Sequence, residues 1–466
     1  MLEGQEISEI RLSELERTKR IDSDFYSKKN IEDLKKLVSI KAQSITNFVS
    51  VSDGNHMSIS EDYCDEGIPY YRGTDIYNFF IEQASNNLKI EKRIFDTPNM
   101  RRSHLKKGDI LMSIVGAIIG NLSLVKTDAD ATCSCKLAIM RPKKIQSEFF
   151  AVYLKSAYGQ NQIQKFKRGS AQTGLILEDF EQILIPDFSD KLITSVTEIV
   201  NYAFAVLEQS KNSYAKAEQV LLEAVGLADF KPSTQNTNIK TFAQSFGTSG
   251  RLDAEYYQPK YEDYLKLIFD YKDGWAKLAE ICTLKDANFN PTNETNYQYI
   301  ELSDIDKSGG ISGCTKDIGE NLPSRARRFV NAGDVVVSSI EGSLSSCALV
   351  PTEYDNSLCS TGFYVIKSQE ISSETLLVLM KSELMQNILK QSCSGTILTA
   401  MNKDEFSNLP IPKIDLTTQT NISQFVQQSF SLKAQSEHLL SVAKRAVEIA
   451  IEQDEAAAMH FIENSQ

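Results

Sequence analysis

The sequence predicts an α+β fold in which two similar α/β domains are joined by two long antiparallel helices that form a coiled coil. Three observations support this prediction. One long stretch of apolar residues has helical periodicity, the stretch recurs 226 residues later, and matching motifs precede both copies. The chain has 466 residues, which is too long for one hydrophobic core of ordinary size, so at least two domains are expected.

The first long helix is expected to run from Leu192 to Val225. Leu192, Val196 and Ile199 are separated by four and then three residues, which is the spacing of an apolar seam along a packed helix. At 1.5 Å per residue, a helix over residues 191–225 is about 50 Å long. Adding 226 to the seam positions gives a second helix of the same kind. The two seams comprise Leu192, Val196, Ile199, Ser210, Ile422, Phe425, Ser436 and Leu439.

Two such helices in one chain can bury their seams against each other. Antiparallel packing places the two domains at opposite ends, whereas parallel packing needs a return path longer than the polar linker 231–238 provides. Ser210 and Ser436 occupy matching positions near the middle of each seam. They have two interpretations: a polar pair that fixes the register of the helices, or small side chains that permit close approach.

Matching motifs precede each long helix in the same order, which indicates an internal repeat. The offset between copies drifts only from 231 to 225, so a handful of loop residues differ between them. Each copy starts with an opening motif of arginine, an aliphatic residue and aspartate, and it ends with Ile-Pro. The matched pairs are Arg20–Tyr26 with Arg251–Tyr257, Lys107–Ser113 with Ala332–Ser338, Gly169-Ser170 with Gly395-Thr396, and Ile185-Pro186 with Ile411-Pro412.

The repeat sets the expected domain boundaries. Each globular domain is followed by its own long helix, and the chain after Gln453 is expected to be frayed helix. The predicted parts are a first domain at residues 1–188, a central helix at 189–228, a second domain at 229–412 and a C-terminal helix at 413–466.

Composition and charge narrow the class of protein. Hydrophobic residues make up 41% and charged residues 24%, as in a globular protein, and no apolar run approaches the roughly 18 residues of a membrane span. The polar, acidic start has no signal-peptide core, so a cytoplasmic location is expected. The eight cysteines form no CxxC pair and predict buried thiols rather than a zinc site. The net charge of −12 argues against non-specific coating of nucleic acid.

Motifs of common catalytic sites are absent from the sequence. There is no GxxxxGK[ST] phosphate loop, no HExxH zinc motif and no GxSxG nucleophile motif. Neither the glycine-rich turn of an S-adenosylmethionine site nor the Asn/Asp-Pro-Pro-aromatic tetrad of an amino-methyltransferase is found. An enzyme with one active site rarely needs two diverged copies of a domain. We therefore expect a non-catalytic protein that binds no metal and no cofactor.

Basic residues gather ahead of the repeated strand in both copies. Arg102 and Arg328 are related by the offset of 226, and each lies in a basic run. Such a run is either a solvated face or a surface that holds phosphates while neighbouring loops read base edges. The loops after the repeated strand differ between copies, as two readers of different sequences require, although ordinary loop drift looks the same. The candidate DNA-binding residues are Arg72, Arg93, Arg101, Arg102, Lys106, Lys107, Ser113, Lys165, Lys167, Arg168, Arg325, Arg327, Arg328, Ser338, Ser339 and Thr396.

In the order of its motifs the chain resembles the specificity subunits of type I restriction–modification systems. The resemblance rests on the duplicated domain and long helix, the Lys107–Ser113 strand with its twin, the two glycine loops, and the helix after each Ile-Pro. It covers essentially the whole chain. It implies two target recognition domains, each of which binds one half of a bipartite site in double-stranded DNA, and a helical spacer that fixes the gap.

The resemblance also implies partners. The spacer helices of such subunits dock two modification (methyltransferase) subunits, which carry S-adenosylmethionine, and a restriction (motor) subunit with ATP and Mg joins them for cleavage. The Ile-Pro exits here lack the Glu-Gln pair that usually follows. Two other functions remain open: a coiled-coil scaffold or adaptor that binds no DNA, and a nuclease or methyltransferase with unrecognised motifs.

Overall fold

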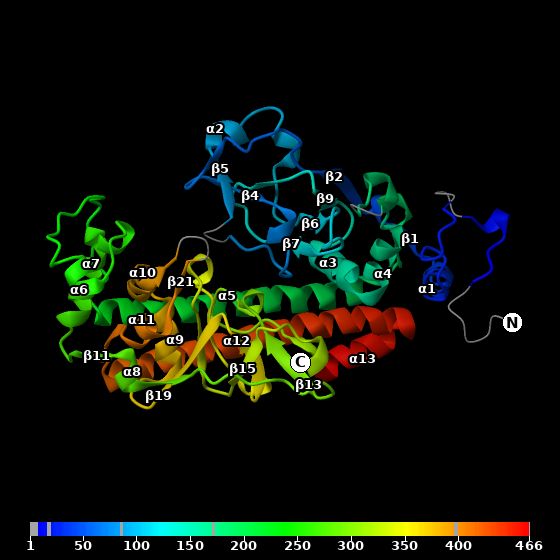
Figure 1. Ribbon diagram of the computed structural model, residues 1–466. Helices are drawn as coiled ribbons and strands as arrows, with labels where there is room; N and C mark the ends of the chain where they lie inside the picture. Colours follow the sequence, from blue (N-terminus) through cyan, green and yellow to red (C-terminus); the bar gives the residue numbers. More distant parts are fainter. Residues whose placement is uncertain (1–7, 16–19, 84–86, 170–172, 396–398, 466) are drawn as a thin grey trace. The chain divides into compact units, whose positions relative to one another are not determined.

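A computed structural model describes residues 8–15, 20–83, 87–169, 173–395 and 399–465 (Figure 1). The chain divides into two compact units. The first unit comprises residues up to Val206 together with Ala434–Gln466, and the second comprises Leu207–Lys433. Each unit contains one globular domain and about half of each long helix, because each half-helix packs on the domain of its own unit. Within the described ranges, no helix is long and apolar enough to cross a membrane.

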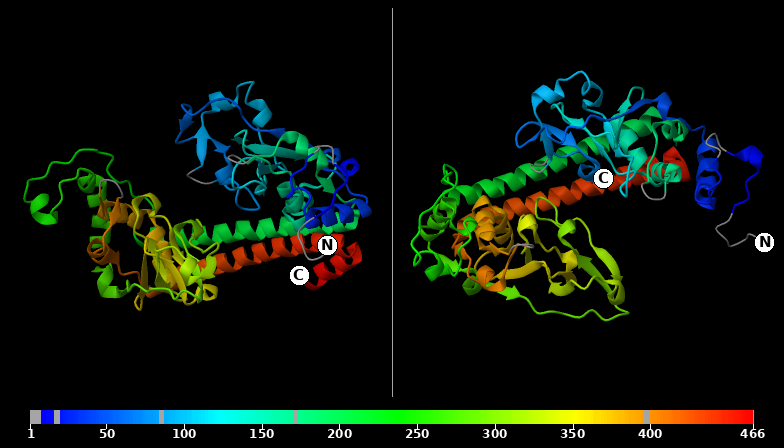
Figure 2. Two further views of the ribbon diagram at one scale, coloured as in Figure 1. Left: turned by 45° about the vertical axis from the view of Figure 1, so that its right-hand side comes forward. Right: turned by 45° about the horizontal axis from the view of Figure 1, so that its top comes forward.

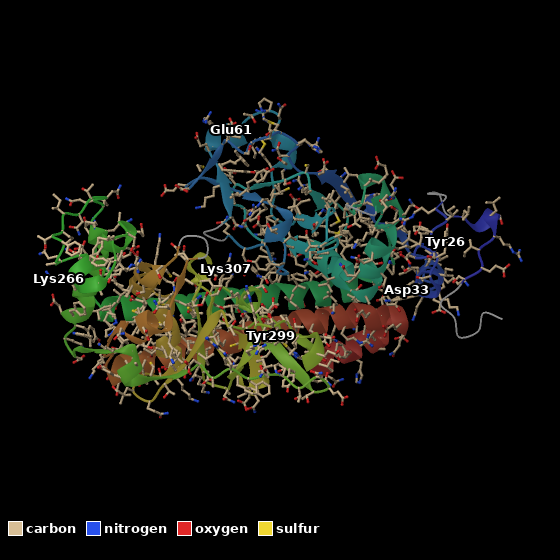
Figure 3. All side chains as sticks on the ribbon, viewed as in Figure 1. Tyr26, Asp33, Glu61, Lys266, Tyr299 and Lys307 are labelled. Carbon is tan, nitrogen blue, oxygen red and sulfur yellow. The ribbon has the colours of Figure 1, made fainter. Side chains whose placement is uncertain are left out.

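The first unit contains two four-stranded sheets. Its elements are α1 (Lys28–Ser39), β1 (Gln43–Ser44), β2 (Val49–Asp53), β3 (Tyr63–Cys64), β4 (Ile68–Tyr71), β5 (Leu88–Ile90), α2 (Lys92–Phe95), β6 (Ile110–Ser113), β7 (Leu122–Leu124), β8 (Thr132–Cys133), β9 (Leu137–Pro142), α3 (Ser147–Lys155), α4 (Ala157–Phe166) and β10 (Leu184–Ile185). One sheet has the order β2-β9-β6-β7 and the other β3-β5-β4-β8. Figure 1 shows β4, β5 and α2 in one part of the first unit, and Figure 3 labels Glu61 in the same part.

The second unit also contains two four-stranded sheets. Its elements are α6 (Phe246–Ser249), α7 (Pro259–Phe269), β11 (Trp275–Lys277), α8 (Leu278–Ile281), β12 (Cys282–Lys285), β13 (Asn296–Ile300), β14 (Thr315–Ile318), β15 (Ala326–Val330), β16 (Val335–Ser338), β17 (Cys347–Leu349), β18 (Ser357–Ser360), β19 (Phe363–Ser368), α9 (Ser373–Lys381), α10 (Glu383–Ser392), β20 (Cys393–Ser394), β21 (Ala400–Met401), α11 (Lys403–Ser407) and β22 (Pro410–Pro412). Its four-stranded sheets have the orders β12-β19-β16-β17 and β14-β13-β18-β15.

The two units share the order of one sheet and a parallel strand pair in the other, which confirms the predicted internal repeat. The second sheets differ in that β8 is an edge strand, whereas β18 lies between β13 and β15. Strands β4 and β8 run parallel with Tyr70 opposite Thr132, and β13 and β18 run parallel with Tyr299 opposite Leu358. Strand β6 lies between β9 and β7 just as β16 lies between β19 and β17. Tyr299, labelled in Figure 3, is buried on its sheet. The two units therefore share one scaffold around β6 and β16, and they differ in the outer strands of the second sheet, in the loops and in the surface side chains.

The Gly-Asp motif ahead of β6 closes a tight turn and anchors it to the sheet. Gly108 has a φ of +89°, which residues with a side chain rarely adopt. The carboxylate of Asp109 is only 1% exposed and accepts the backbone N–H of Lys106 at 2.8 Å. Arg141 on β9 donates to both carboxylate oxygens at 2.7 Å. The paired charges explain how this aspartate can be buried.

The second unit repeats this turn with a different cation. Gly333 has a φ of +83°, and the fully buried Asp334 accepts the backbone N–H of Asn331 at 2.8 Å. Here Lys285 on β12 donates to the carboxylate at 2.7 Å. The recurrence of the motif in the sequence therefore has a structural cause, since both turns place a charged pair in the sheet.

The two long helices form as α5 (Asp190–Ala224) and α12 (Leu416–Glu452). In the second unit, Ser210 Oγ donates to the carbonyl of Ser429 at 2.8 Å and Ser213 Oγ to that of Phe425 at 2.9 Å. A later residue of α5 thus meets an earlier residue of α12, so the helices run antiparallel, as predicted. In the first unit, the other halves of the same helices also lie side by side (Figure 2).

The two seam serines do not form a pair with each other, and each instead makes its own hydrogen bond across the seam. A role of these hydroxyls in fixing the register stays a prediction. Ser210 bonds to Ser429, and Ser436 Oγ donates to the carbonyl of Ala203 at 2.7 Å. A hydroxyl reaches a backbone carbonyl across the seam only where the helices approach closely, which is the other interpretation. The remaining apolar seam residues are buried, apart from the half-buried Phe425.

The chain after Gln453 is a helix and not the frayed end that was expected. Residues Glu455–Ser465 form α13. The carboxylate of Glu455 accepts the backbone N–H of Ser189 at 2.9 Å, just ahead of α5. This hydrogen bond satisfies one of the free N–H groups at the start of α5. The dipole of α5 also favours a negative charge at this end, which Glu455 supplies.

Candidate nucleic-acid interface

The arginine of the opening motif fixes the end of α4, where a glycine loop begins. Arg20 forms an ion pair with Asp22, with 2.7 Å between Nε and Oδ2, and it donates to the carbonyls of Phe166 and Lys167 at 3.2 Å. Its guanidinium lies 4.7 Å from the ring centre of Phe25. The hydrogen bond from Arg20 lowers the pKa of the Asp22 carboxyl. A cation at the C-terminal end of a helix also interacts favourably with the helix dipole.

The second unit holds the end of α10 in the same way. Arg251 pairs with Asp253 and donates to the carbonyls of Gln391 and Cys393, at 3.2 and 2.8 Å. Its guanidinium lies 4.3 Å from the ring centre of Tyr256. The opening motif recurs because it fixes the start of the loop that follows α4 in the first unit and α10 in the second.

That loop lies against the loop that follows the repeated strand. In the first unit the N–H of Gly116 donates to the carbonyl of Thr173 at 2.9 Å, and in the second the N–H of Glu341 donates to that of Thr399 at 3.0 Å. Two backbone loops are thus held together by matched hydrogen bonds, while their side chains differ between units. Such a frame can present different side chains to two different ligands without a change of fold.

Three serines were predicted as contacts at these loops. Ser113 and Ser338 are fully buried, so their hydroxyls shape the loops instead of facing a ligand. Ser338 Oγ accepts the N–H of Ile340 at 3.2 Å, and Ser339 Oγ donates to the carbonyl of Gly362 at 2.9 Å. Thr396, the fourth candidate of this kind, lies outside the described residues.

The basic run of the first unit is exposed and contains two kinds of side chain. Arg101 and Lys106 form no side-chain hydrogen bond or ion pair with any residue that the structure describes. Arg93 pairs with Glu91, with 2.5 Å between Nε and Oε2, and this hydrogen bond lowers the pKa of the Glu91 carboxyl. The ammonium of Lys107 lies 3.7 Å from a carboxylate oxygen of the exposed Asp128. Arg102 also has a carboxylate partner, Asp53.

Four further basic candidates belong to the first unit, and the side chains of three of them contact residues within it. These are Arg72, Lys165, Lys167 and Arg168. Arg72 Nε lies 3.6 Å from Asp75, and Arg168 forms an ion pair with the buried Asp179. The ammonium of Lys165 lies 4.3 Å from the ring centre of an aromatic residue in the opening motif. Lys167 is half-buried, and its backbone carbonyl accepts a hydrogen bond from Arg20.

The three arginines of the second unit differ in how far they face solvent. Arg325 is exposed and has no side-chain partner in the described part of the chain. Arg327 is half-buried and donates to Asn290 Oδ1 at 2.5 Å. Arg328 is turned inward, where its guanidinium donates to the carbonyl of Phe363. The matched basic runs of the sequence are therefore not matched surfaces.

Net charge also distinguishes the two domains. Residues 1–188 contain 26 basic and 26 acidic side chains, whereas residues 229–412 contain 17 and 24. The second domain therefore has a net charge of −7, and the first has a net charge of zero. Attraction to phosphates must come from local clusters, and the first unit has the more extensive one.

A matched turn after β2 and β12 was not predicted from the sequence. Asp53-Gly54-Asn55 and Asp286-Ala287-Asn288 are related by an offset of 233. Asp53 pairs with Arg102, and Asp286 pairs with Lys403. The shared Asp-x-Asn spacing was the available signal. Its importance depends on the cations that the fold brings to each aspartate, which lie far away in the sequence.

Comparison with known proteins gives a family for part of the chain. Residues 272–441 match the family described as Type I restriction modification DNA specificity domain. The specificity subunit of the type I restriction enzyme EcoBI from Escherichia coli is 26% identical over 165 residues, which are 34% of this chain and 34% of that relative. The matched part thus spans about a third of the relative's length.

Two solved structures also align with most of the chain. The type I restriction-modification system S subunit from M. genitalium has a TM-score of 0.40 at 12% identity, covering 88% of this chain and 94% of that chain. The HsdS subunit from Thermoanaerobacter tengcongensis has a TM-score of 0.27 at 14% identity, covering 84% of this chain and 94% of that chain.

Proposed function

We propose that this chain is the specificity subunit of a type I restriction–modification complex, because its residues 272–441 match the family described as Type I restriction modification DNA specificity domain. Each unit reads one half of a bipartite site in double-stranded DNA. The two long helices, α5 and α12, set the spacing of the half-sites. The chain itself is non-catalytic.

The observation that carries this proposal is the combination of the family match with the repeat. The matched residues include most of the second domain and the first part of α12. The first unit has the same strand order in one of its two four-stranded sheets and the same opening and Gly-Asp motifs, but its exposed side chains differ. Two scaffolds of one kind with different surfaces are what recognition of two unlike half-sites requires.

The chemistry in this proposal belongs to partner subunits. Two modification subunits dock on the long helices and bind S-adenosylmethionine, and a restriction subunit supplies the ATP- and Mg-dependent step. The acidic balance of the second domain and of the helices favours protein contacts on much of the surface. The scaffold alternative, without DNA, is disfavoured because the matched family is one of DNA specificity domains.

Binding to DNA in the presence of partners tests the proposal. The chain mixed with its modification subunits is expected to shift a pool of random DNA duplexes in a gel and to transfer methyl groups to a subset of them. The modification subunits without the chain should do neither at the same concentration. Methyl transfer by the chain alone would overturn the assignment of the chain as non-catalytic. Failure of the mixture to bind DNA would favour the alternative function, a coiled-coil scaffold protein that binds no DNA.

A further inference from the structure

We propose that Arg102 reads a base edge, a guanine in the major groove, in the half-site of the first unit, and that Asp53 positions its guanidinium. The inference rests on the proposed DNA-binding function and identifies a side chain that carries sequence information within it. Arginine is the residue that most often recognises guanine, through two parallel N–H donors to O6 and N7.

The backbone that carries Arg102 is anchored. Arg102 lies in a short 3-10 turn, Arg101–Ser103, just after Met100, which is buried. The fully buried Ser103 donates from Oγ to the carbonyl of Met100 at 2.8 Å, and it accepts a hydrogen bond from the hydroxyl of Thr132 on β8, also at 2.8 Å. Base recognition needs a donor held within a fraction of an ångström, and this turn supplies a fixed starting point.

The carboxylate that meets Arg102 is equally well fixed. Asp53 is the last residue of β2, and the turn after it packs so closely that a Cβ on Gly54 would lie 2.4 Å from the carbonyl of Cys133. Asn55 is 2% exposed, and its side chain bonds to the N–H and the carbonyl of Met57, at 2.9 and 3.1 Å. This turn cannot shift without loss of buried contacts.

One carboxylate holds two exposed donors at the surface. Asp53 is 14% exposed, and it accepts a hydrogen bond from Nη2 of Arg102. Its other oxygen lies 2.5 Å from Nε2 of His56. The side chains of Arg102 and His56 are 54% and 59% exposed. Within the described part of the chain, Nε and Nη1 of Arg102 have no partner, so several of its five N–H groups face solvent.

The pairing of Arg102 with Asp53 suits a base better than a phosphate. The two charges offset each other, so the pair attracts a phosphate weakly, while its free N–H groups keep their direction. Arg101 and Lys106 have the opposite character, since neither has a carboxylate partner among the described residues and each keeps its positive charge. Net charge holds the backbone of DNA, and fixed donors discriminate between bases.

The matched turn in the second unit carries different donors. Asp286 stands where Asp53 stands, but it pairs with Lys403, and the hydrogen bond from Lys403 lowers the pKa of its carboxyl. Arg328, which the sequence aligns with Arg102, is folded onto the ring of Tyr364 instead. The matched aspartate thus holds an arginine in the first unit and a lysine in the second. Different donors at the same place in the fold are what recognition of two different half-sites needs.

The test compares variants of the full complex, with modification subunits, by selection of bound duplexes from a random pool at several salt concentrations. Arg102→Lys keeps the charge but loses the paired donors. It is expected to reduce discrimination at one base pair of one half-site by roughly tenfold to a hundredfold, with no change in salt dependence. Lys106→Ala, the matched control, should weaken binding to all sequences alike and reduce the salt slope by about one.

Asp53→Asn tests the positioning role, because it leaves Arg102 in place without its partner. We expect the same base pair to lose discrimination while the slope with salt becomes steeper. Unchanged discrimination in Arg102→Lys, or uniform weakening of all sequences, would overturn the inference. If the wild-type complex selects no site at all, the proposed function itself fails. Thermal unfolding of each variant, compared with the wild type, separates these results from misfolding.

Discussion

Replacing residues 1–188 by the matching domain of another specificity subunit should change one half of the recognised DNA site and leave the other half unaltered. The physical reason is that the two units are separate compact bodies, each with its own sheets and loops. A wrong base pair costs about 1–3 kcal/mol, so the old half-site, with about three wrong pairs, should bind at least a hundredfold more weakly. Selection of bound duplexes by the complex measures the change.

The reciprocal exchange of residues 229–412 is the matched control and should change the other half-site. Joining the foreign domain ahead of Asp190 leaves both long helices intact, so the spacing of the half-sites should stay the same. A change in both half-sites after either exchange, or in neither, would contradict the assignment of one reader to each unit.

Asp109→Asn should lower the free energy of unfolding of the first unit by about 2–3 kcal/mol, which is the second large effect that we expect. Asp109 is 1% exposed and bonds to two donors of Arg141, whose side chain is 36% exposed. The substitution removes the negative charge that balances Arg141. Because the guanidinium of Arg141 is partly accessible to water, the loss of folding free energy is limited. For a body of this size the melting temperature should fall by about 5–10 °C.

Asp128→Asn is the control for this change. Asp128 is 82% exposed and lies 3.7 Å from Lys107, so the pair is solvated and its loss should cost less than about 0.5 kcal/mol. Urea denaturation followed by circular dichroism measures both variants. Equal stability of the two would show that the buried pair under the Gly-Asp turn does not hold the sheet together.

The long helices and the repeat were predictable because they depend on periodicity in the chain itself. Leu192, Val196 and Ile199 are buried along one face of α5, as their spacing requires. The opening motif was visible as a repeat for a similar reason, since Arg20 and Arg251 each meet an aspartate only two residues away. Local patterns of this kind are set by neighbours in the sequence.

The partners of the polar side chains could not be predicted, because the fold chooses them from distant segments. Ser210 bonds to Ser429, which is not its equivalent in the repeat, because antiparallel packing reverses the order of contacts. Arg328 was a surface candidate by alignment, yet it is turned inward to the carbonyl of Phe363 on the neighbouring sheet. Asp53 was overlooked because its partner Arg102 lies 49 residues away.

The most direct test of the central claim is to sequence the methylated sites in the DNA of a host that expresses this chain with its modification subunits. If each unit reads one half-site and α5 and α12 fix the gap, every methylated site will carry the same two short sequences separated by a constant number of unspecified base pairs. A single contiguous methylated sequence, or two half-sites at variable spacing, would contradict this account of the protein.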